Sequence, residues 1–131
     1  MIVVDTHVLI WYLDSPEKLS QAARSVLEEA VRTRGVNVSS ISAWEIYMLV
    51  KKGRLELRIP VATWMSRVEH LSFVHVIPVD NEIMRLSVES PGTVPPDRAD
   101  RIIIATAKFL GEPLVTADAR IRELSEIQTI W

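Results

Sequence analysis

The sequence contains no cysteine, so disulfide bonds and thiolate metal sites are both excluded. This absence fits a reducing cytoplasm, which is the location we expect. The first residues read Met-Ile-Val-Val-Asp, without the basic segment and long apolar stretch of a signal peptide. The longest apolar runs extend over only a few residues, far fewer than a membrane span requires.

A large excess of charge of either sign is also missing. The formal net charge is −2 at pH 7, which provides no overall attraction to nucleic acid. Binding of nucleic acid would therefore need a local basic patch, and one candidate is the cluster Lys51, Lys52, Arg54 and Arg58. The alternative interpretation of this cluster is a solvated, charged end of a helix.

The pattern of apolar residues predicts an α/β protein. The chain has 131 residues, 48% of them hydrophobic, and we take residues 1–131 as a single domain with a substantial core. Strands are predicted at 1–4, 36–39, 74–79, 113–116 and 127–131, and helices at 6–13, 20–34, 43–52, 61–71, 82–89, 100–110 and 119–124, with a loop at 90–99. This alternation favours a three-layer α/β/α fold with a mainly parallel central sheet of about five strands.

Four acidic residues stand at predicted strand ends or helix starts: Asp5, Glu45, Asp100 and Asp118. The carboxyl ends of parallel strands share one edge of a sheet, and ligands bind there. Carboxylates gathered at that edge repel one another unless a cation neutralises them, and Mg²⁺ prefers oxygen ligands of this kind. The four acids therefore predict a site for Mg²⁺ or Mn²⁺, suited to phosphodiester hydrolysis by a metal-activated water.

Each acid also has a simpler interpretation as a helix cap, because helix N-termini stabilise carboxylates. Glu45 follows Ser42 by three residues, which is the spacing of a capping box. Capping explains any one of these residues taken alone. It explains the set of four less well, because right-handed crossovers bring several of these ends to one edge.

Four segments of the sequence, in order, resemble those of the PIN-domain ribonucleases. They are residues 5–11 (Asp-Thr-His-Val-Leu-Ile-Trp), 42–46 (Ser-Ala-Trp-Glu-Ile), 97–105 (Asp-Arg-Ala-Asp-Arg-Ile-Ile-Ile-Ala) and 115–118 (Val-Thr-Ala-Asp). The resemblance covers essentially the whole chain and is greatest to the VapC toxins of bacterial and archaeal toxin–antitoxin pairs. Any one segment is a weak signal, whereas all four at these spacings are a strong one.

The resemblance implies roles for the four acids. Asp5 and Asp100 are expected to be the principal metal ligands. Glu45 is expected to bind the metal, or to position and deprotonate the water, and Asp118 to complete the site directly or through water.

Three further residues are matched as supporting ones. Thr116 matches a small polar position near the metal. Asp97 is followed by Arg98 where relatives usually have proline, and we interpret it as a supporting or loop residue. Arg101 is expected to contact either phosphate or an acidic side chain.

The resemblance also implies an endoribonuclease acting on structured RNA such as tRNA or rRNA, held silent by a small VapB-like antitoxin and commonly a homodimer. Two alternatives remain open: an RNA-processing PIN nuclease without an antitoxin, and a non-catalytic RNA-binding PIN module. A haloacid-dehalogenase-type phosphatase needs a second aspartate at the position of His7, and a response-regulator receiver needs an acid where Val4 stands. Of the four tryptophans, Trp44 is the one most expected to lie in the core.

Overall fold

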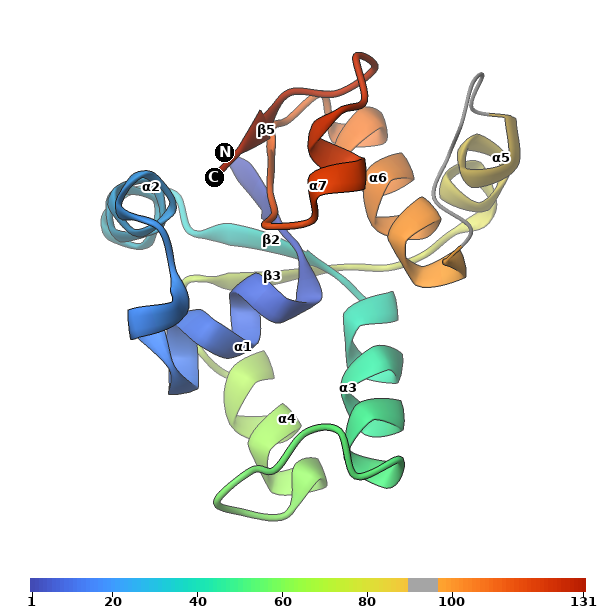
Figure 1. The fold of residues 1–131 in the computed structure, drawn as a ribbon. Coiled ribbons are helices and arrows are strands. Elements are labelled where there is room, and N and C mark those ends of the chain that lie inside the picture. The colour runs from blue at the N-terminus through green and yellow to red at the C-terminus, as the bar shows by residue number, and fades with distance from the viewer. Residues whose placement is uncertain (90–96) are drawn as a thin grey trace.

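A parallel sheet forms the centre of the protein (Figure 1). The computed structural model describes residues 1–89 and 97–131. Its five strands lie in the order β3-β2-β1-β4-β5, and every adjacent pair is parallel, as predicted. The strands are β1 (Ile2–Val4), β2 (Val36–Ser39), β3 (Val74–Ile77), β4 (Leu114–Val115) and β5 (Thr129–Ile130).

The helices begin and end largely where local signals place them. They are α1 (Thr6–Asp14), the short 3-10 helix η1 (Pro16–Lys18), α2 (Gln21–Arg32), α3 (Ile41–Lys51), α4 (Val61–Glu69), α5 (Asn81–Glu89), α6 (Arg98–Leu110) and α7 (Ala119–Arg122). Ser20 caps α2 by accepting a hydrogen bond from the Ala23 N–H, as predicted. Gly111 ends α6 in the left-handed conformation, with φ of 65°.

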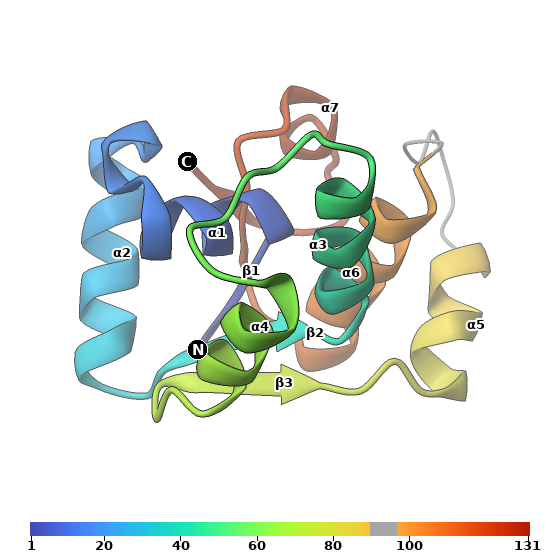
Figure 2. The same cartoon turned by 90° about the horizontal axis from the view of Figure 1, so that it is seen from below.

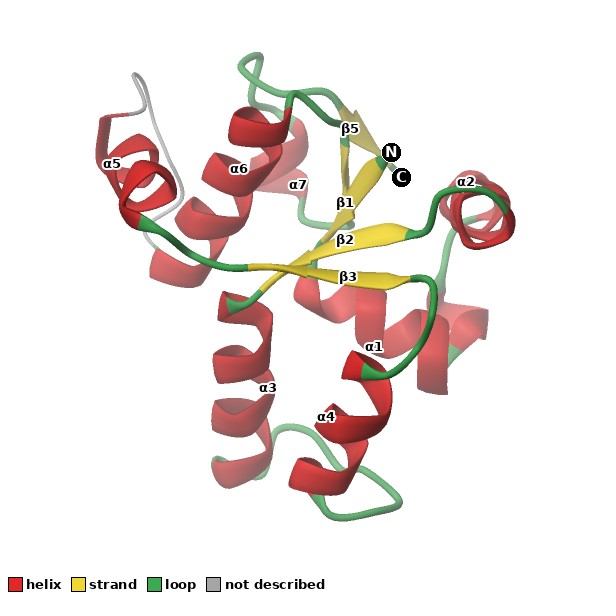
Figure 3. Ribbon diagram, turned by 180° about the vertical axis from the view of Figure 1, so that it is seen from behind, coloured by secondary structure: helices red, strands yellow, loops and turns green. Residues whose placement is uncertain are grey.

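Two hydrophobic clusters cover the two faces of the sheet. All three residues of β1 are buried, and successive side chains of a strand point to opposite faces. Ile2 and Val4 belong to the cluster that includes residues of α1, α2 and α4, whereas Val3 packs with α6 and α7. Figure 3 shows the strands between these two groups of helices, so the predicted three layers are present.

The chain order creates a crevice at the carboxyl edge of the sheet. From β1 the chain proceeds to β2 and β3 on one side, and β4 and β5 are added later on the other side of β1. Ligands of open parallel sheets bind at such a change of direction. In Figure 2 the arrow of β3 points to the side of the molecule on which α3, α5 and α6 lie, and α3 and α6 contact each other.

Two local predictions need correction. The helix predicted to begin at Asp100 begins at Arg98, because Asp97 caps it by accepting a hydrogen bond from the Asp100 N–H at 3.1 Å. The rest of the predicted 90–99 loop, residues 90–96, lies outside the described residues. The helix α3 begins at Ile41, so Glu45 lies beyond its first turn. Within the described part of the chain, no helix combines the length and apolar character needed to cross a membrane.

Candidate active site

Asp5 lies at the centre of the crevice, directly after β1. Its backbone N–H donates to the Val115 carbonyl at the end of β4, which fixes Asp5 between the two strands. The side chain is only 7% exposed, and each of its oxygens accepts one hydrogen bond. Oδ1 accepts from the Thr6 N–H and Oδ2 from the Thr116 hydroxyl, both at 2.7 Å. The carboxylate is therefore held in one orientation with lone pairs left for another ligand.

Thr116 forms hydrogen bonds with both Asp5 and Asp118. Its hydroxyl is completely buried and, besides donating to Asp5, accepts a hydrogen bond from the Asp118 N–H at 3.1 Å. Asp118 caps α7, and its Oδ1 accepts from the Arg120 N–H at 2.9 Å. Its Oδ2 lies 3.6 Å from the Arg120 guanidinium. The one hydroxyl therefore links Asp5 to the segment that positions Asp118.

Glu45 approaches Asp5 from α3. Its Oε1 accepts a hydrogen bond from the Thr6 hydroxyl at 2.6 Å. Because that proton is used, the Ser42 hydroxyl, 2.8 Å from the Thr6 oxygen, donates to it. The capping-box interpretation of Ser42 and Glu45 was wrong, since both side chains contact Thr6. Thr6 carries no specific signal in the sequence for this role beyond its position next to Asp5.

Three of the four predicted acids meet at one point. Oxygen atoms of Asp5, Glu45 and Asp100 lie within 4.8 Å of one another. A cleft of about 340 Å³ opens over them and is also lined by Asp118 and Asp97, together with His7, Trp11 and Ala117. Asp118 thus lies in the same cleft but outside the tight group of three. Arg101 is half-buried and is not among the described residues that line the cleft.

The acids raise one another's pKa values. Burial, followed by the negative charges of Asp5, Asp97, Glu45 and Asp118, raises the pKa of Asp100 from 3.8 to about 7. Burial also raises the pKa of Asp5 in spite of the hydrogen bonds from Thr116 and Thr6. The pKa of Glu45 is raised by burial first and by the charges of Asp5 and Asp97 next. All three carboxylates are therefore costly to keep ionised without a nearby positive charge.

A hard divalent cation fits this group of side chains. The donors are all carboxylate oxygens, without histidine nitrogen or sulfur among the three, which is the chemistry that Mg²⁺ and Mn²⁺ accept. A cation would also offset the burial and the mutual repulsion that raise the three pKa values. The cluster is thus consistent with the metal site typical of PIN nucleases.

The aromatic side chains of Trp44 and His7 are both exposed, although Trp44 was predicted to lie in the core. Trp44 is 56% exposed on α3, so the prediction that it lies in the core was wrong. The neighbours of Trp44 in the sequence are mostly apolar, but its own position on α3 is exposed. His7 is exposed and lines the cleft, in keeping with a supporting position near Asp5.

Comparison with known proteins identifies the family. The family model of the PIN domain matches residues 2–127, so this chain belongs to the PIN-domain family. Ribonuclease VapC22 from Mycobacterium tuberculosis is 36% identical over 133 residues, covering 99% of this chain and 98% of that protein. This degree of identity makes the chain a VapC-type ribonuclease homologue within the family.

Solved structures share the fold. VapBC2 from Rickettsia felis, bound to a promoter DNA fragment, matches with a TM-score of 0.69 and 16% identity, covering 98% of this chain and 97% of that one. A toxin–antitoxin complex from Klebsiella pneumoniae has a TM-score of 0.64 and 21% identity, with coverage of 97% and 95%. VapC20 from Mycobacterium tuberculosis, a sarcin–ricin-loop-cleaving toxin, has a TM-score of 0.66 and 16% identity, with coverage of 98% and 99%.

Proposed function

We propose that this protein is a Mg²⁺-dependent endoribonuclease and the toxin of a toxin–antitoxin pair, with Mn²⁺ able to replace Mg²⁺. One observation carries the proposal. In a VapC-type PIN chain, oxygens of Asp5, Glu45 and Asp100 lie within 4.8 Å of one another at the carboxyl edge of the sheet. The whole chain would act as one PIN domain.

Each acidic side chain of the site has a separate role in the proposed reaction. Asp5 and Asp100 are the principal metal ligands, and Asp118 completes the site from the rim of the cleft. A bound divalent ion lowers the pKa of water and stabilises negative charge on the phosphate. Glu45, whose own pKa is raised, positions the attacking water and accepts its proton. Thr116 keeps the Asp5 carboxylate in place through the 2.7 Å hydrogen bond.

The relatives support a class of substrate and a kind of partner. VapC20 is described as cleaving the sarcin–ricin loop, which supports structured RNA such as rRNA or tRNA as the substrate class. The Klebsiella match is a toxin–antitoxin complex, which supports a small VapB-like antitoxin as partner. Trp44 and Tyr47 expose apolar surface on α3, 56% and 43% respectively, which is available to an antitoxin or to a second copy in a homodimer. We expect the protein to act in the cytoplasm.

The test is cleavage of total RNA by antitoxin-free protein in the presence of Mg²⁺, of Mn²⁺ or of EDTA. The Asp5→Asn variant is assayed in parallel. Discrete fragments should appear with either ion, disappear in EDTA and be absent from the variant, whose circular dichroism should match that of the wild type. Sequencing the fragment ends then identifies the cleaved RNA. Cleavage that persists in EDTA, or in Asp5→Asn, would refute the metal-dependent mechanism.

The antitoxin is tested separately. The small gene beside the toxin gene should encode a protein that co-purifies with this chain and stops the cleavage. Active protein with no inhibitory neighbour would instead favour the RNA-processing alternative.

A further inference from the structure

A second cavity lies next to the acidic cleft. It has a volume of about 430 Å³ and is lined by His7, Ile10, Trp11, Asp14, Ser15, Lys18, Leu49, Arg54, Leu55 and Glu56. His7 and Trp11 line both spaces, so the cleft and the cavity are neighbours with a common wall. The roles assigned to the four acids make no use of this second space.

Helix geometry explains why the two spaces are adjacent. His7 and Trp11 are four residues apart on α1, and Glu45 and Leu49 are four apart on α3. Residues at this spacing lie on the same face of a helix, about one turn or 5.4 Å apart. The contacting helices α1 and α3 therefore form a groove that leads from Glu45 at the acids to Leu49 in the cavity.

Trp11 presents a fixed aromatic ring in the wall of this groove. Its ring centroid lies 5.9 Å from that of His7 and 5.9 Å from that of Trp131, with the rings tilted by 54° and 55°. These neighbours hold the indole, yet Trp11 is only half-buried. A held and partly exposed indole is a surface on which a nucleobase can stack.

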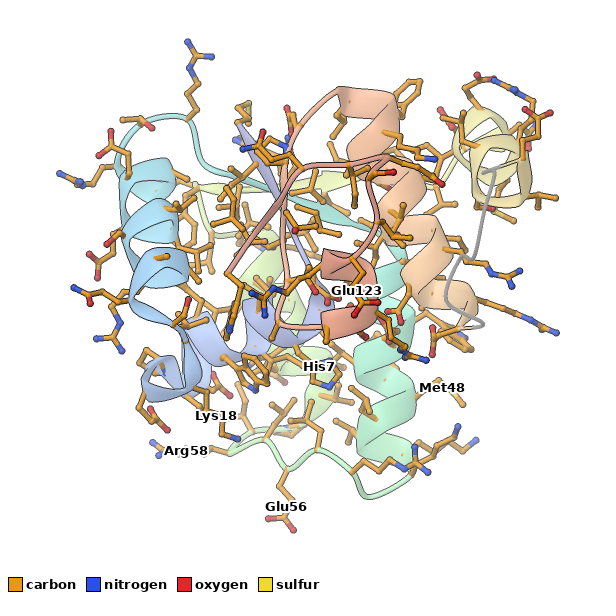
Figure 4. The ribbon with its side chains drawn as sticks, turned by 45° about the horizontal axis from the view of Figure 1, so that its top comes forward. His7, Lys18, Met48, Glu56, Arg58 and Glu123 are labelled. Carbon is orange, nitrogen blue, oxygen red and sulfur yellow. The ribbon has the colours of Figure 1, made fainter. Side chains whose placement is uncertain are left out.

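Positive charges lie at the far end of the groove. Lys18 and Arg54 are both exposed, and neither forms an ion pair among the residues that the structure describes. Two acids also line the cavity, but Asp14 accepts a hydrogen bond from the Trp64 indole at 3.3 Å. The other, Glu56, points outward from the loop between α3 and α4 (Figure 4). Lys51 and Lys52, both exposed, extend the basic surface at the end of α3.

We propose that the groove between α1 and α3 binds single-stranded RNA next to the cleaved bond. Trp11 stacks on a base, while Lys18 and Arg54 bind the adjoining phosphate groups. This inference rests on the proposed ribonuclease function. It identifies the α1–α3 groove as the path along which the RNA strand enters or leaves the acidic cleft. It also gives a role to part of the basic cluster that follows Glu45 in the sequence.

The role of the Lys18 and Arg54 charges is tested by measuring the affinity of the protein for a fluorescein-labelled, ten-nucleotide RNA of random sequence in Mg²⁺. The measurement uses the Asp100→Asn variant, which should bind RNA without cleaving it. Fluorescence anisotropy is measured at several salt concentrations. Combining Asp100→Asn with Lys18→Gln and Arg54→Gln should weaken binding at least tenfold. It should also make the slope of log K against log salt shallower by about 1.4, at about 0.7 per lost phosphate contact on a single strand. The matched control replaces Arg32 and Arg34 by glutamine, which removes two exposed charges near the opposite edge of the sheet.

Stacking is tested at Trp11 in the same assay. Trp11→Leu should weaken binding about tenfold, whereas Trp11→Phe should keep most of the affinity because it keeps an aromatic face. In the cleaving protein, the Lys18 and Arg54 substitutions should raise KM while leaving kcat nearly unchanged, since neither residue is among the described residues that line the acidic cleft.

The outcomes separate this inference from the proposed function. If the wild type does not cleave RNA but its binding depends on Trp11, Lys18 and Arg54, the nuclease proposal fails and the groove remains an RNA site. If RNA is cleaved but the groove variants bind and cleave as the control does, the groove proposal is overturned. Loss of antitoxin binding by the groove variants, with RNA binding unchanged, would also overturn it and assign the cavity to the protein partner.

Discussion

Replacing Asp100 by asparagine should stabilise the metal-free protein at pH 8. The folded protein raises the pKa of this carboxyl from 3.8 to about 7. Such a shift corresponds to about 4 kcal/mol at 1.36 kcal/mol per pKa unit. Because the side chain is only half-buried, solvent screening reduces this figure, and we expect about 2 kcal/mol.

The free energy of unfolding of the metal-free protein should fall as the pH rises from 4 to 7. Between pH 4 and pH 7 the folded protein holds a proton on Asp100 that the unfolded chain has lost. The folded state thus binds more protons in this window, so stability falls as pH rises and the full penalty is present above pH 7. The pKa values of Asp5 and Glu45 are raised too and add to the same slope. Asp100→Asn should make the slope smaller without removing it.

The assay is urea unfolding followed by tryptophan fluorescence at pH 5, 6.5 and 8 in EDTA. Glu69→Gln, which removes an exposed carboxylate at the end of α4, is the control and should change little. Adding Mg²⁺ at pH 8 should stabilise the wild type and have less effect on Asp100→Asn, because binding to the folded state alone raises its stability. The reasoning is refuted if Asp100→Asn is no more stable than the wild type at pH 8 in EDTA and has the same pH slope.

Three further predictions concern single side chains. Thr116→Val should lower metal affinity, measured by calorimetry, and cleavage rate by about tenfold, because Asp5 loses the hydrogen bond that orients it; Thr116→Ser should restore both. Asp97→Ala should lower the free energy of unfolding by about 1 kcal/mol through loss of the α6 cap, and Asp97→Ser should recover it; equal stability of both variants would contradict the capping role. Gly35→Ala should lower the urea midpoint clearly, because φ is +83° and a Cβ would lie 2.5 Å from the Phe73 carbonyl oxygen; an unchanged midpoint would contradict this.

Much of the fold is predictable because its signals are local. The apolar runs before Asp5 and Asp118 predict buried strands, and the helices predicted at 20–34 and 100–110 have Ser20 and Gly111 as their caps in the structure. The parallel arrangement follows from the alternation of elements, since only crossovers can connect strands of this kind. The prediction of where a helix starts was less accurate where two residues could each cap it, as at Asp97 and Asp100.

The site was predictable as a set of acids but not as a network. Asp5, Glu45 and Asp100 were expected together, and their oxygens do meet. Glu45 reaches them from the second turn of α3, where no capping rule applies. Thr6 donates to Asp5 through its backbone N–H and, through its hydroxyl, to Glu45, which lies 39 positions further along the sequence. No local pattern in the sequence indicates the contact with Glu45. Trp44 was misplaced for the same reason, because exposure depends on which face of α3 its neighbours cover.

The hydrogen bond between Thr116 and Asp5 spans 111 positions of the sequence, and β4 pairs with β1 only after the residues between the two strands have been made. During synthesis, Asp5 emerges first and remains without its orienting hydroxyl until the last strands arrive. Parallel pairing over such a separation is slow, because closing a long loop costs entropy before the contacts form. A nascent chain on the ribosome therefore carries its acids in an unassembled state. The fold itself therefore delays assembly of the acidic site until β4 has been made and has paired with β1.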